Sequence, residues 1–426
     1  MSERGLTDTR STDTQISAGE LERLASAVDT KELVELTRRL VRIPSVYRPS
    51  AGEAEGPCAE FVADYLRNLG LPGLEVKVEE VAPGRPNVIG VLSSGKPGRT
   101  LLYEGHTDVV TEGDRAAWTH DPFGAEIVDG RIYGRGSCDT KGNLAAAIIA
   151  VRALVETGMF RKGRIVLAIP VDEEGLMLGI KHFIRAGHAA GVDAAVICEP
   201  EENQLCITQK GAMRAVVRTR GVMAHGAMPL SGVNPIPRMA AIIAAMGDYE
   251  RAEKARLGCH PYLGWPSITP TIVSAPVNGE PQINVIPDEA YMTLDIRTIP
   301  GQDHAEMERT FQGILARLAQ TDPDFKAELE IIERRPWTET DLGEPIVRAF
   351  DAAYRVVSGG KEPIYNGVPG ATDGTFLNAW AGIPILTTGA GNRLIPHQKD
   401  EYVDIAELEE AARLYAVAGA LFLGEA

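Results

Sequence analysis

Short apolar runs that end in turn or polar residues recur along the chain and alternate with helix-like segments. They are TLLYEG (100–105), RIVLAIPV (164–171), DAAVIC (193–198) and IPILTTG (383–389). Such uninterrupted apolar runs are typical of strands that are buried on both faces of a sheet. Between the first two runs, apolar residues recur at helical spacing until Gly158 stops the helix; they are Leu144, Ile148, Val151 and Val155. The pattern therefore predicts an α/β fold.

The pattern changes between about residues 211 and 330. Alternating polar and apolar stretches appear there, AVVRTRG and AYMTLDIRT, around two helix-like segments, PIPRMAAIIAAMGDYERA and DHAEMERTFQGILARLAQ. Alternation of this kind indicates strands with one face in water, so we expect a small α+β unit inserted into a larger domain. The predicted division is 1–210 and 331–426 for the larger domain and 211–330 for the insert. The first 28 or so residues are polar and of mixed charge, which predicts a loose arm.

Composition narrows the possible partners. The chain has 426 residues, more than one core usually organises, and a formal charge of −16, which disfavours nucleic acids and anionic membranes as partners. The apolar stretch near the C-terminal end, Leu414 to Gly424, is shorter than the roughly 20 residues that a bilayer crossing needs, so no membrane span is expected. The five cysteines have no metal-finger spacing, and their odd number argues against a disulfide framework. We therefore expect a cytoplasmic protein.

Acidic and imidazole side chains follow each of the predicted strands. His106 and Asp108 come after the first strand, Glu173 and Glu174 after the second, Glu199 after the third, and His397 a short loop after the fourth. Catalytic groups of open α/β sheets collect at the carboxyl ends of strands. The sequence therefore predicts that these side chains meet at one edge of the sheet.

A metal centre is the chemistry that fits these residue types. Catalytic zinc takes nitrogen and oxygen ligands on a rigid frame, and a pair of ions about 3.5 to 4 Å apart needs a bridging carboxylate. Two imidazoles and three carboxylates could supply such a site: His106 in GHTDVV, Asp139 in GRGSCDTKGN, Glu174 in PVDEEG, Glu199 in ICEPEE and His397 in LIPHQKDEYV. Glycines 134, 136 and 142 match neither a dinucleotide fingerprint nor a P-loop, which argues against phosphate binding.

The order and contexts of these segments resemble the metal-dependent amidohydrolases and peptidases that include acetylornithine deacetylase, succinyl-diaminopimelate desuccinylase, aminoacylase and glutamate carboxypeptidase. The resemblance covers nearly the whole chain, because it includes GVMAHGAMP and NVIP in the insert and ATDGTFLNAWAGIP after it. It implies a zinc-peptidase-like catalytic domain with a mixed, mainly parallel sheet flanked by helices. The inserted α+β unit would then be a lid and dimerisation domain.

By this resemblance, Asp139 bridges two ions, His106 and Glu199 complete one site, and Glu174 and His397 complete the other. The resemblance also implies a cis peptide bond between Asp139 and Thr140. One or two divalent ions per subunit are expected. Zinc is the first choice, and manganese or cobalt is also possible because oxygen-rich mixed ligand sets accept them.

Further roles follow from the same resemblance. Glu173 would be the general base, because two adjacent carboxylates on an extended segment point in different directions and rarely bind one ion together. Asp108 would hydrogen-bond the ring of His106 and orient it. His225 would reach across a dimer interface to stabilise the oxyanion. Substrate-binding residues would be Asn284, Arg297, Thr372 and Asp373.

Some alternatives stay open. A surface salt bridge for Arg297 and a structural turn for His225 are simpler explanations of those residues. Thr375 stands where relatives that process dicarboxylates often carry an arginine, which argues against a second substrate carboxylate in that subsite. The expected reaction is hydrolysis of a C–N bond in a small molecule, foremost the amide of an N-acyl amino acid. Deamination of an aromatic or heterocyclic amine and a non-catalytic binding relative are the alternatives.

Overall fold

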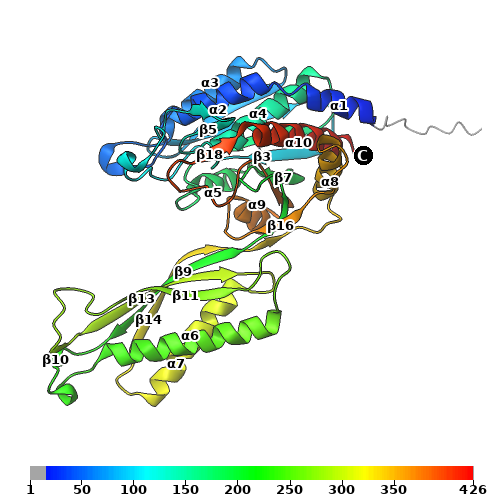
Figure 1. Ribbon diagram of the computed structural model, residues 1–426. Helices are drawn as coiled ribbons and strands as arrows, with labels where there is room; N and C mark the ends of the chain where they lie inside the picture. Colours follow the sequence, from blue (N-terminus) through cyan, green and yellow to red (C-terminus); the bar gives the residue numbers. More distant parts are fainter. Residues whose placement is uncertain (1–15, 426) are drawn as a thin grey trace, which may run out of the picture.

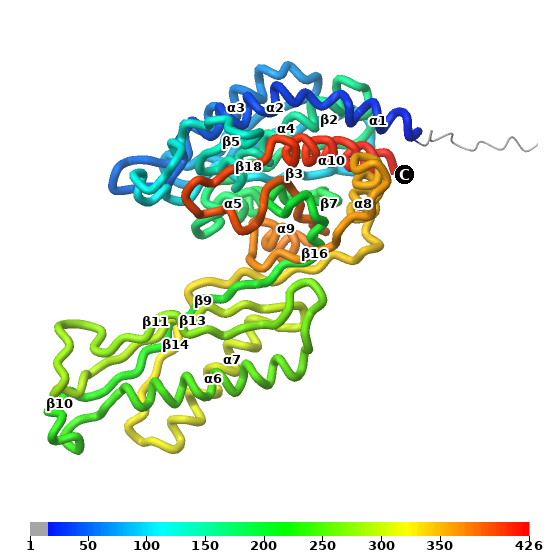
Figure 2. Tube along the Cα trace, in the orientation of Figure 1, coloured from blue at the N-terminus to red at the C-terminus, as the bar shows by residue number. Residues whose placement is uncertain are grey.

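The computed structural model describes residues 16–425, which form two bodies joined end to end (Figure 1). The larger body holds a sheet with helices on both faces, and the smaller one holds a second sheet with two helices against one face (Figure 1). The tube in Figure 2 shows that the smaller body is a single excursion of the chain, between the green and orange parts of the larger one.

The large sheet has nine strands within the described residues. In spatial order they are β1 (Leu74–Ala82), β2 (Arg85–Ser93), β6 (Arg164–Ile169), β3 (Thr100–Glu104), β7 (Ala194–Ile197), β17 (Ile385–Thr387), β8 (Leu205–Gln209) and β15 (Thr338–Glu339), with β16 (Tyr365–Val368) also paired to β8. The central strands β6, β3, β7 and β17 are parallel, whereas β1, β2, β8 and β15 make antiparallel pairs. The predicted mixed sheet with a parallel centre is confirmed.

Helices bury both faces of this sheet, as the apolar runs predicted. The helices of the larger body are α1 (Ala18–Ser26), α2 (Thr30–Val41), α3 (Gly56–Asn68), α4 (Lys141–Glu156), α5 (Leu178–Arg185), α8 (Pro345–Val357), α9 (Gly374–Ala381) and α10 (Ile405–Gly424). Alternate residues of β3 enter different cores: Leu101 and Tyr103 pack with α4 and α10, and Leu102 packs with α5 and α9. Both sides of a central strand are therefore apolar.

Helix α4 is apolar nearly all round because the sheet and two other helices surround it. It makes contacts with α10 and α2, and alanines let these helices approach closely. Gly158 follows the helix with a left-handed φ of 70°, so the predicted stop is confirmed.

The expectation of a loose arm over the first 28 residues is wrong for its second part. Helix α1 begins after a capping box between Ser17 and Glu20, and it buries Leu21 and Leu24. These leucines belong to the main core, where α1 contacts α10. The sequence pattern did not reveal this amphipathic helix because its two leucines stand among charged residues. Residues 1–15 lie outside the described part of the chain.

The smaller body is a four-stranded antiparallel sheet in the order β11 (Ser267–Ser274), β13 (Glu289–Thr298), β9 (Gly211–Arg220) and β14 (Lys326–Arg335). Helices α6 (Pro235–Leu257) and α7 (His304–Thr321) cover one face, and the other face is polar. Burial alternates along β13, as expected for a strand with one face in water. A short pair, β10 (Ala224–His225) with β12 (Val285–Ile286), lies at the far end (Figure 1).

A third, small sheet joins β4 (Glu126–Val128), β5 (Arg131–Tyr133) and β18 (Tyr402–Asp404) beside the carboxyl ends of the central strands. It brings a C-terminal strand against the segment that leads to Asp139. Among the described residues, no helix combines the length and the apolar character that a bilayer crossing would require.

Candidate metal centre

The central parallel strands deliver the expected ligands to one edge of the sheet. His106 follows β3 and Glu199 follows β7, and these strands pair directly, with Glu104 opposite Ile197. Glu174 lies in the loop after β6. Parallel neighbours end at the same edge, which is why residues far apart in the sequence meet here.

One cluster contains His106, Asp139 and Glu199. The Nε2 atom of His106 lies 3.2 Å from Oδ1 of Asp139 and 3.6 Å from Oε1 of Glu199. All three ligand atoms lie within 4.8 Å of one another, a spacing that one ion could span. His106 is fully buried and Glu199 nearly so, so this cluster is held inside the protein.

A second cluster contains Asp139, Glu174 and His397, again with ligand atoms within 4.8 Å. Nε2 of His397 lies 2.9 Å from Oε1 of Glu174 and 3.4 Å from Oδ2 of Asp139. The two oxygens of Asp139 therefore face one imidazole each. The His397 side chain is 54% exposed, so this cluster opens to solvent.

Electrostatics favour a cation at this position. Burial, together with the charge of Asp139, raises the pKa of Glu199 and of Glu174. Hydrogen bonds to Asp139 and Glu174 raise the pKa of His397 to about 10. Although burial alone would lower the pKa of His106, Asp139 and the neighbouring carboxylates hold it well above its usual range.

The three ligand carboxylates repel one another, and the same carboxylates raise the pKa values of the two imidazoles, which favours positive charge on the rings. Divalent cations would replace protons on the rings and offset most of the negative charge. Two imidazoles and three carboxylates, one of them shared, form a donor set that suits zinc, manganese or cobalt. The residues present therefore fit one or two divalent ions.

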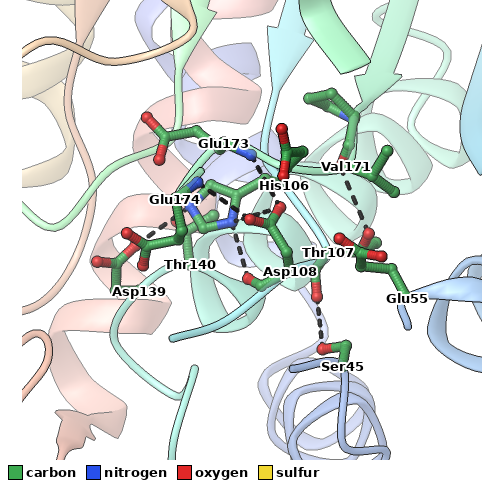
Figure 3. Close-up of polar contacts among 12 residues, drawn as sticks. Ser45, Glu55, His106, Thr107, Asp108, Asp139, Thr140, Val171, Glu173 and Glu174 are labelled. Atoms are coloured by element: carbon green, nitrogen blue, oxygen red, sulfur yellow. Dashed lines mark hydrogen bonds and ion pairs between the residues drawn. The ribbon is translucent and has the colours of Figure 1, made fainter. Parts of the chain in front are cut away.

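Glu173 lies beside the clusters and belongs to neither. Figure 3 shows the carboxylates of Glu174 and Asp139 together, with the Glu173 side chain directed away from them. Burial raises the pKa of Glu173 well above its usual range, and the charges of Asp373, Glu174 and Asp139 add to that effect. A carboxylate of this kind takes up a proton readily, as a general base requires.

The contact between Asp108 and His106 differs from the expected one. Nδ1 of His106 lies 3.0 Å from the main-chain oxygen of Asp108, whereas the Asp108 carboxylate is 3.6 Å away. Both carboxylate oxygens instead accept hydrogen bonds from the main-chain N–H groups of Glu173 and Glu174, at 3.1 and 3.0 Å (Figure 3). The ring is thus oriented by the main chain of Asp108, and its side chain fixes the glutamate pair.

The insert places two expected residues at its far end. His225 is exposed on β10, and its Nδ1 accepts a hydrogen bond from the N–H of Ala227 at 3.0 Å. Asn284 is exposed in the turn before β12. Neither belongs to the metal clusters of its own chain, and Figure 1 shows β10 at the end of the insert that lies away from the larger body.

The other expected substrate-binding residues lie near the junction of the two bodies or inside the larger one. Arg297 forms an ion pair with Asp295 on the polar face of the insert, with 2.6 Å between Nε and Oδ1. This contact is the surface salt bridge that was the simpler explanation of Arg297. Thr372 is buried and donates a hydrogen bond to Gln209 at 2.9 Å. Asp373 is fully buried, and neither of its carboxylate oxygens has a hydrogen-bond partner within the described residues.

Sequence reasoning missed two buried glutamates near the centre. Glu104 ends β3, where burial raises its pKa to about 8 and leaves both oxygens without a partner among the described residues. Glu401 precedes β18 and accepts hydrogen bonds from the turn that carries Asp139. An acid at the end of an apolar run was the available signal for Glu104, and an acid just after the His397 segment was the signal for Glu401. The Asp139–Thr140 peptide bond is cis, as expected.

Comparison with known proteins agrees with this geometry. The model of peptidase family M20/M25/M40 matches residues 102–418, which is most of the chain. The chain belongs to this family. The match includes the segments of all five expected metal ligands, so the expected family, and with it a metal-dependent hydrolase of C–N bonds, is confirmed.

Individual relatives of this M20 family chain cover nearly its whole length. A succinyl-diaminopimelate desuccinylase from Methylocella silvestris is 31% identical over 400 residues, with 90% of this chain and 96% of the relative covered. An N-formyl-4-amino-5-aminomethyl-2-methylpyrimidine deformylase from Bacillus subtilis is 28% identical, with 90% and 93% covered. An M20 family metallo-carboxypeptidase from Sulfolobus solfataricus shares the fold, with a TM-score of 0.74, 20% identity, and 92% and 99% covered.

Proposed function

We propose that this M20 family hydrolase cleaves the amide bond of a small N-acyl compound, foremost an N-acyl amino acid, and releases a carboxylate and an amine. The observation that carries the proposal is the pair of ligand clusters that share Asp139, with Glu173 beside them and outside both. The relatives support the reaction type, because a desuccinylase and a deformylase both remove acyl groups from nitrogen.

His106, Asp139 and Glu199 would hold one divalent ion, and Asp139, Glu174 and His397 the other. When bound, the ions supply Lewis-acid activation of the attacking water and of the substrate carbonyl. Glu173 takes a proton from the water as its oxygen bonds to the carbonyl carbon. The same proton then passes to the leaving nitrogen as the C–N bond breaks.

Asp108 keeps this base in place, because its carboxylate binds the main-chain N–H groups of both glutamates. The contacts also separate the roles of the two glutamates: the Glu174 side chain is held by His397, so the Glu173 side chain is left for proton transfer. Thr372 and Asp373 would line the substrate pocket in the main domain, and Arg297 would line it in the insert. Asn284, which lies at the far end of the insert with His225, would reach the pocket of a partner subunit.

The substrate would lack a second carboxylate in the subsite next to α9. Thr375 is fully buried there, and its hydroxyl donates a hydrogen bond to the main-chain oxygen of Pro336. A buried threonine with its hydroxyl already engaged offers no positive charge for a carboxylate. A substrate without a second carboxylate, such as an N-formyl or N-acetyl compound, fits this subsite better than an N-succinyl compound does.

The active form would be a cytoplasmic homodimer that assembles through the insert. His225 cannot serve its own chain's clusters from the far end of the insert, so a second subunit would have to receive it. Large apolar side chains are exposed near it, which is typical of a surface that another protein covers; they are Val222, Met223, Met228, Leu230 and Ile283. Strand β11 is also an open edge with Ile272 and Val273 exposed.

A substrate panel scored for both products tests this proposal. The purified protein, loaded with zinc, manganese or cobalt, is incubated with N-formyl, N-acetyl and N-succinyl amino acids, dipeptides and heterocyclic amines. We expect equal amounts of a carboxylic acid and an amine from the N-formyl and N-acetyl amino acids. Release of ammonia without a carboxylic acid would show instead that the chain is a deaminase.

A further inference from the structure

Glu401 is a buried carboxylate that belongs to neither ligand cluster. It lies between His397 and strand β18, so it is part of the segment that carries a ligand. Its side chain is directed toward the turn that ends in Asp139, a segment distant in the sequence. A fully buried carboxylate needs strong partners, and here all of them come from that turn.

One oxygen of Glu401 accepts three main-chain hydrogen bonds. Its Oε1 atom lies 2.9 Å from the N–H nitrogen of Gly136, 3.1 Å from that of Cys138 and 3.0 Å from that of Asp139. The turn can close around this oxygen because Gly136 has a φ of 85°, and a Cβ there would lie 2.7 Å from Val109. Successive N–H groups that converge on one oxygen form an anion-binding concavity.

The other oxygen of Glu401 pairs with Arg135, whose guanidinium is also buried. Arg135 stacks over Trp118 at 5.2 Å and donates to the main-chain oxygen of Thr111 at 3.3 Å. The main-chain oxygen of Glu401 accepts from the N–H of Gly134 at 2.8 Å. The carboxylate is thus fully satisfied, and its charge is matched within the protein.

The two ion sites differ in the elements that carry their ligands. His106 and Glu199 follow β3 and β7, which pair directly, so the sheet fixes their separation. Glu174 and His397 lie on loops instead. The distance between Asp139 and His397 therefore depends on contacts between the segments that carry these two residues. Glu401, on the His397 segment, makes such contacts with the turn that ends in Asp139.

We propose that Glu401 is a positioning residue that ties the His397 segment to the Asp139 turn and so builds the ion site of Asp139, Glu174 and His397. This inference rests on the proposed function only in assuming that the clusters bind divalent ions. It makes Glu401 the residue that couples the bridging ligand to the more exposed site. The site of His106 and Glu199 depends on it less.

Zinc binding to Glu401 variants tests the proposal. Each protein is titrated with Zn²⁺ in competition with a chromophoric chelator, and the visible spectrum of the Co²⁺ form reports the geometry. In Glu401→Gln, which keeps the shape, we expect the weaker ion to bind about 10-fold less tightly, and in Glu401→Ala about 100-fold, with a smaller change in the tighter ion. The turnover number should fall while KM changes little.

Glu253→Gln is the matched control, because Glu253 is a buried glutamate of the insert that pairs with Arg256 and accepts from Gln302. Thermal unfolding without metal separates a loss of stability from a loss of affinity. If Glu401→Ala does not fold, Glu401→Gln alone decides. Affinities and Co²⁺ spectra of Glu401→Gln equal to those of Glu253→Gln would overturn the inference, and so would equal weakening of both ions. Failure of the unmodified protein to bind any divalent ion would contradict the proposed function instead.

Discussion

Adjacent glutamates at positions 173 and 174 differ in what their side chains contact. Glu174 contacts His397 at 2.9 Å, whereas Glu173 is excluded from both clusters. We predict that Glu173→Ala keeps its metal and its stability while turnover falls at least about 100-fold, the scale for loss of a general base. Elemental analysis and steady-state kinetics check this, with Glu174→Ala as the comparison. Loss of metal in Glu173→Ala and its retention in Glu174→Ala would show that the roles are reversed.

The protonation of His397 leads to a second prediction. Its pKa is raised to about 10, so at pH 8 the ring is charged in the metal-free protein. A raised pKa stabilises the metal-free fold below about pH 6.5, and that stabilisation is lost as the pH rises through about 10. A metal ion needs the neutral ring, so binding at pH 8 should release a proton from His397.

Calorimetry of Zn²⁺ binding in buffers of different ionisation enthalpy counts the released protons. We expect His397→Ala to release about one proton fewer than the unmodified protein at pH 8. Zinc affinity should also rise between pH 7 and 9. Equal proton release from both proteins would mean that the ring is already neutral before the ion binds.

Single residues were predictable where the sequence places them next to a strand end. His106, Glu174 and Glu199 each follow an apolar run, so their meeting could be inferred from the fold class. The contact of Asp108 with the glutamate main chain could not, because it depends on the direction of two loop N–H groups. Glu401 was missed for the same reason, since its partners are main-chain atoms of a distant turn.

Between elements, a buried lysine joins the start of α4 to the end of α2. Nζ of Lys141 donates to the main-chain oxygens of Leu40 at 3.0 Å and Ile43 at 2.7 Å. A cation at the carboxyl end of a helix satisfies open carbonyls and favours the helix dipole. We predict that Lys141→Met lowers the free energy of unfolding by about 2 kcal/mol, which urea denaturation of the metal-free protein would measure.

Lys31→Met is the control for this change, because Lys31 is an exposed lysine on the same helix α2. Its effect should stay within about 0.5 kcal/mol. Comparable losses in the two variants would show that the buried contacts of Lys141 contribute nothing particular.

Elements with a clear period were predictable, and those without one were not. The run 164–171 became β6, and the helical spacing from Leu144 became α4. Helix α1 was missed because only Leu21 and Leu24 carry its apolar side among charged neighbours. The short strands β4, β5 and β18 have too few residues to show any period.

At the scale of the whole molecule, a dimer would have to form for His225 to take part in the reaction. The proposed dimer would bring His225 to a partner's metal centre. Glu173→Ala and His225→Ala should each be inactive alone. After subunit exchange, a mixture should regain up to about a quarter of the unmodified activity, since half of the dimers are hybrids with one complete site. No recovery despite exchange shown by mass spectrometry of the intact dimers would contradict the role of His225.

The central claim is that the two clusters joined by Asp139 hold the ions on which catalysis depends. The most direct test follows turnover of an N-acyl substrate against metal content as a chelator removes the ions and Zn²⁺, Mn²⁺ or Co²⁺ restores them. We predict that activity disappears with the metal and returns with it, and that Asp139→Ala, which loses the ligand common to both clusters, is not rescued by any of these ions. Full turnover by protein that elemental analysis shows to be free of metal would contradict the account.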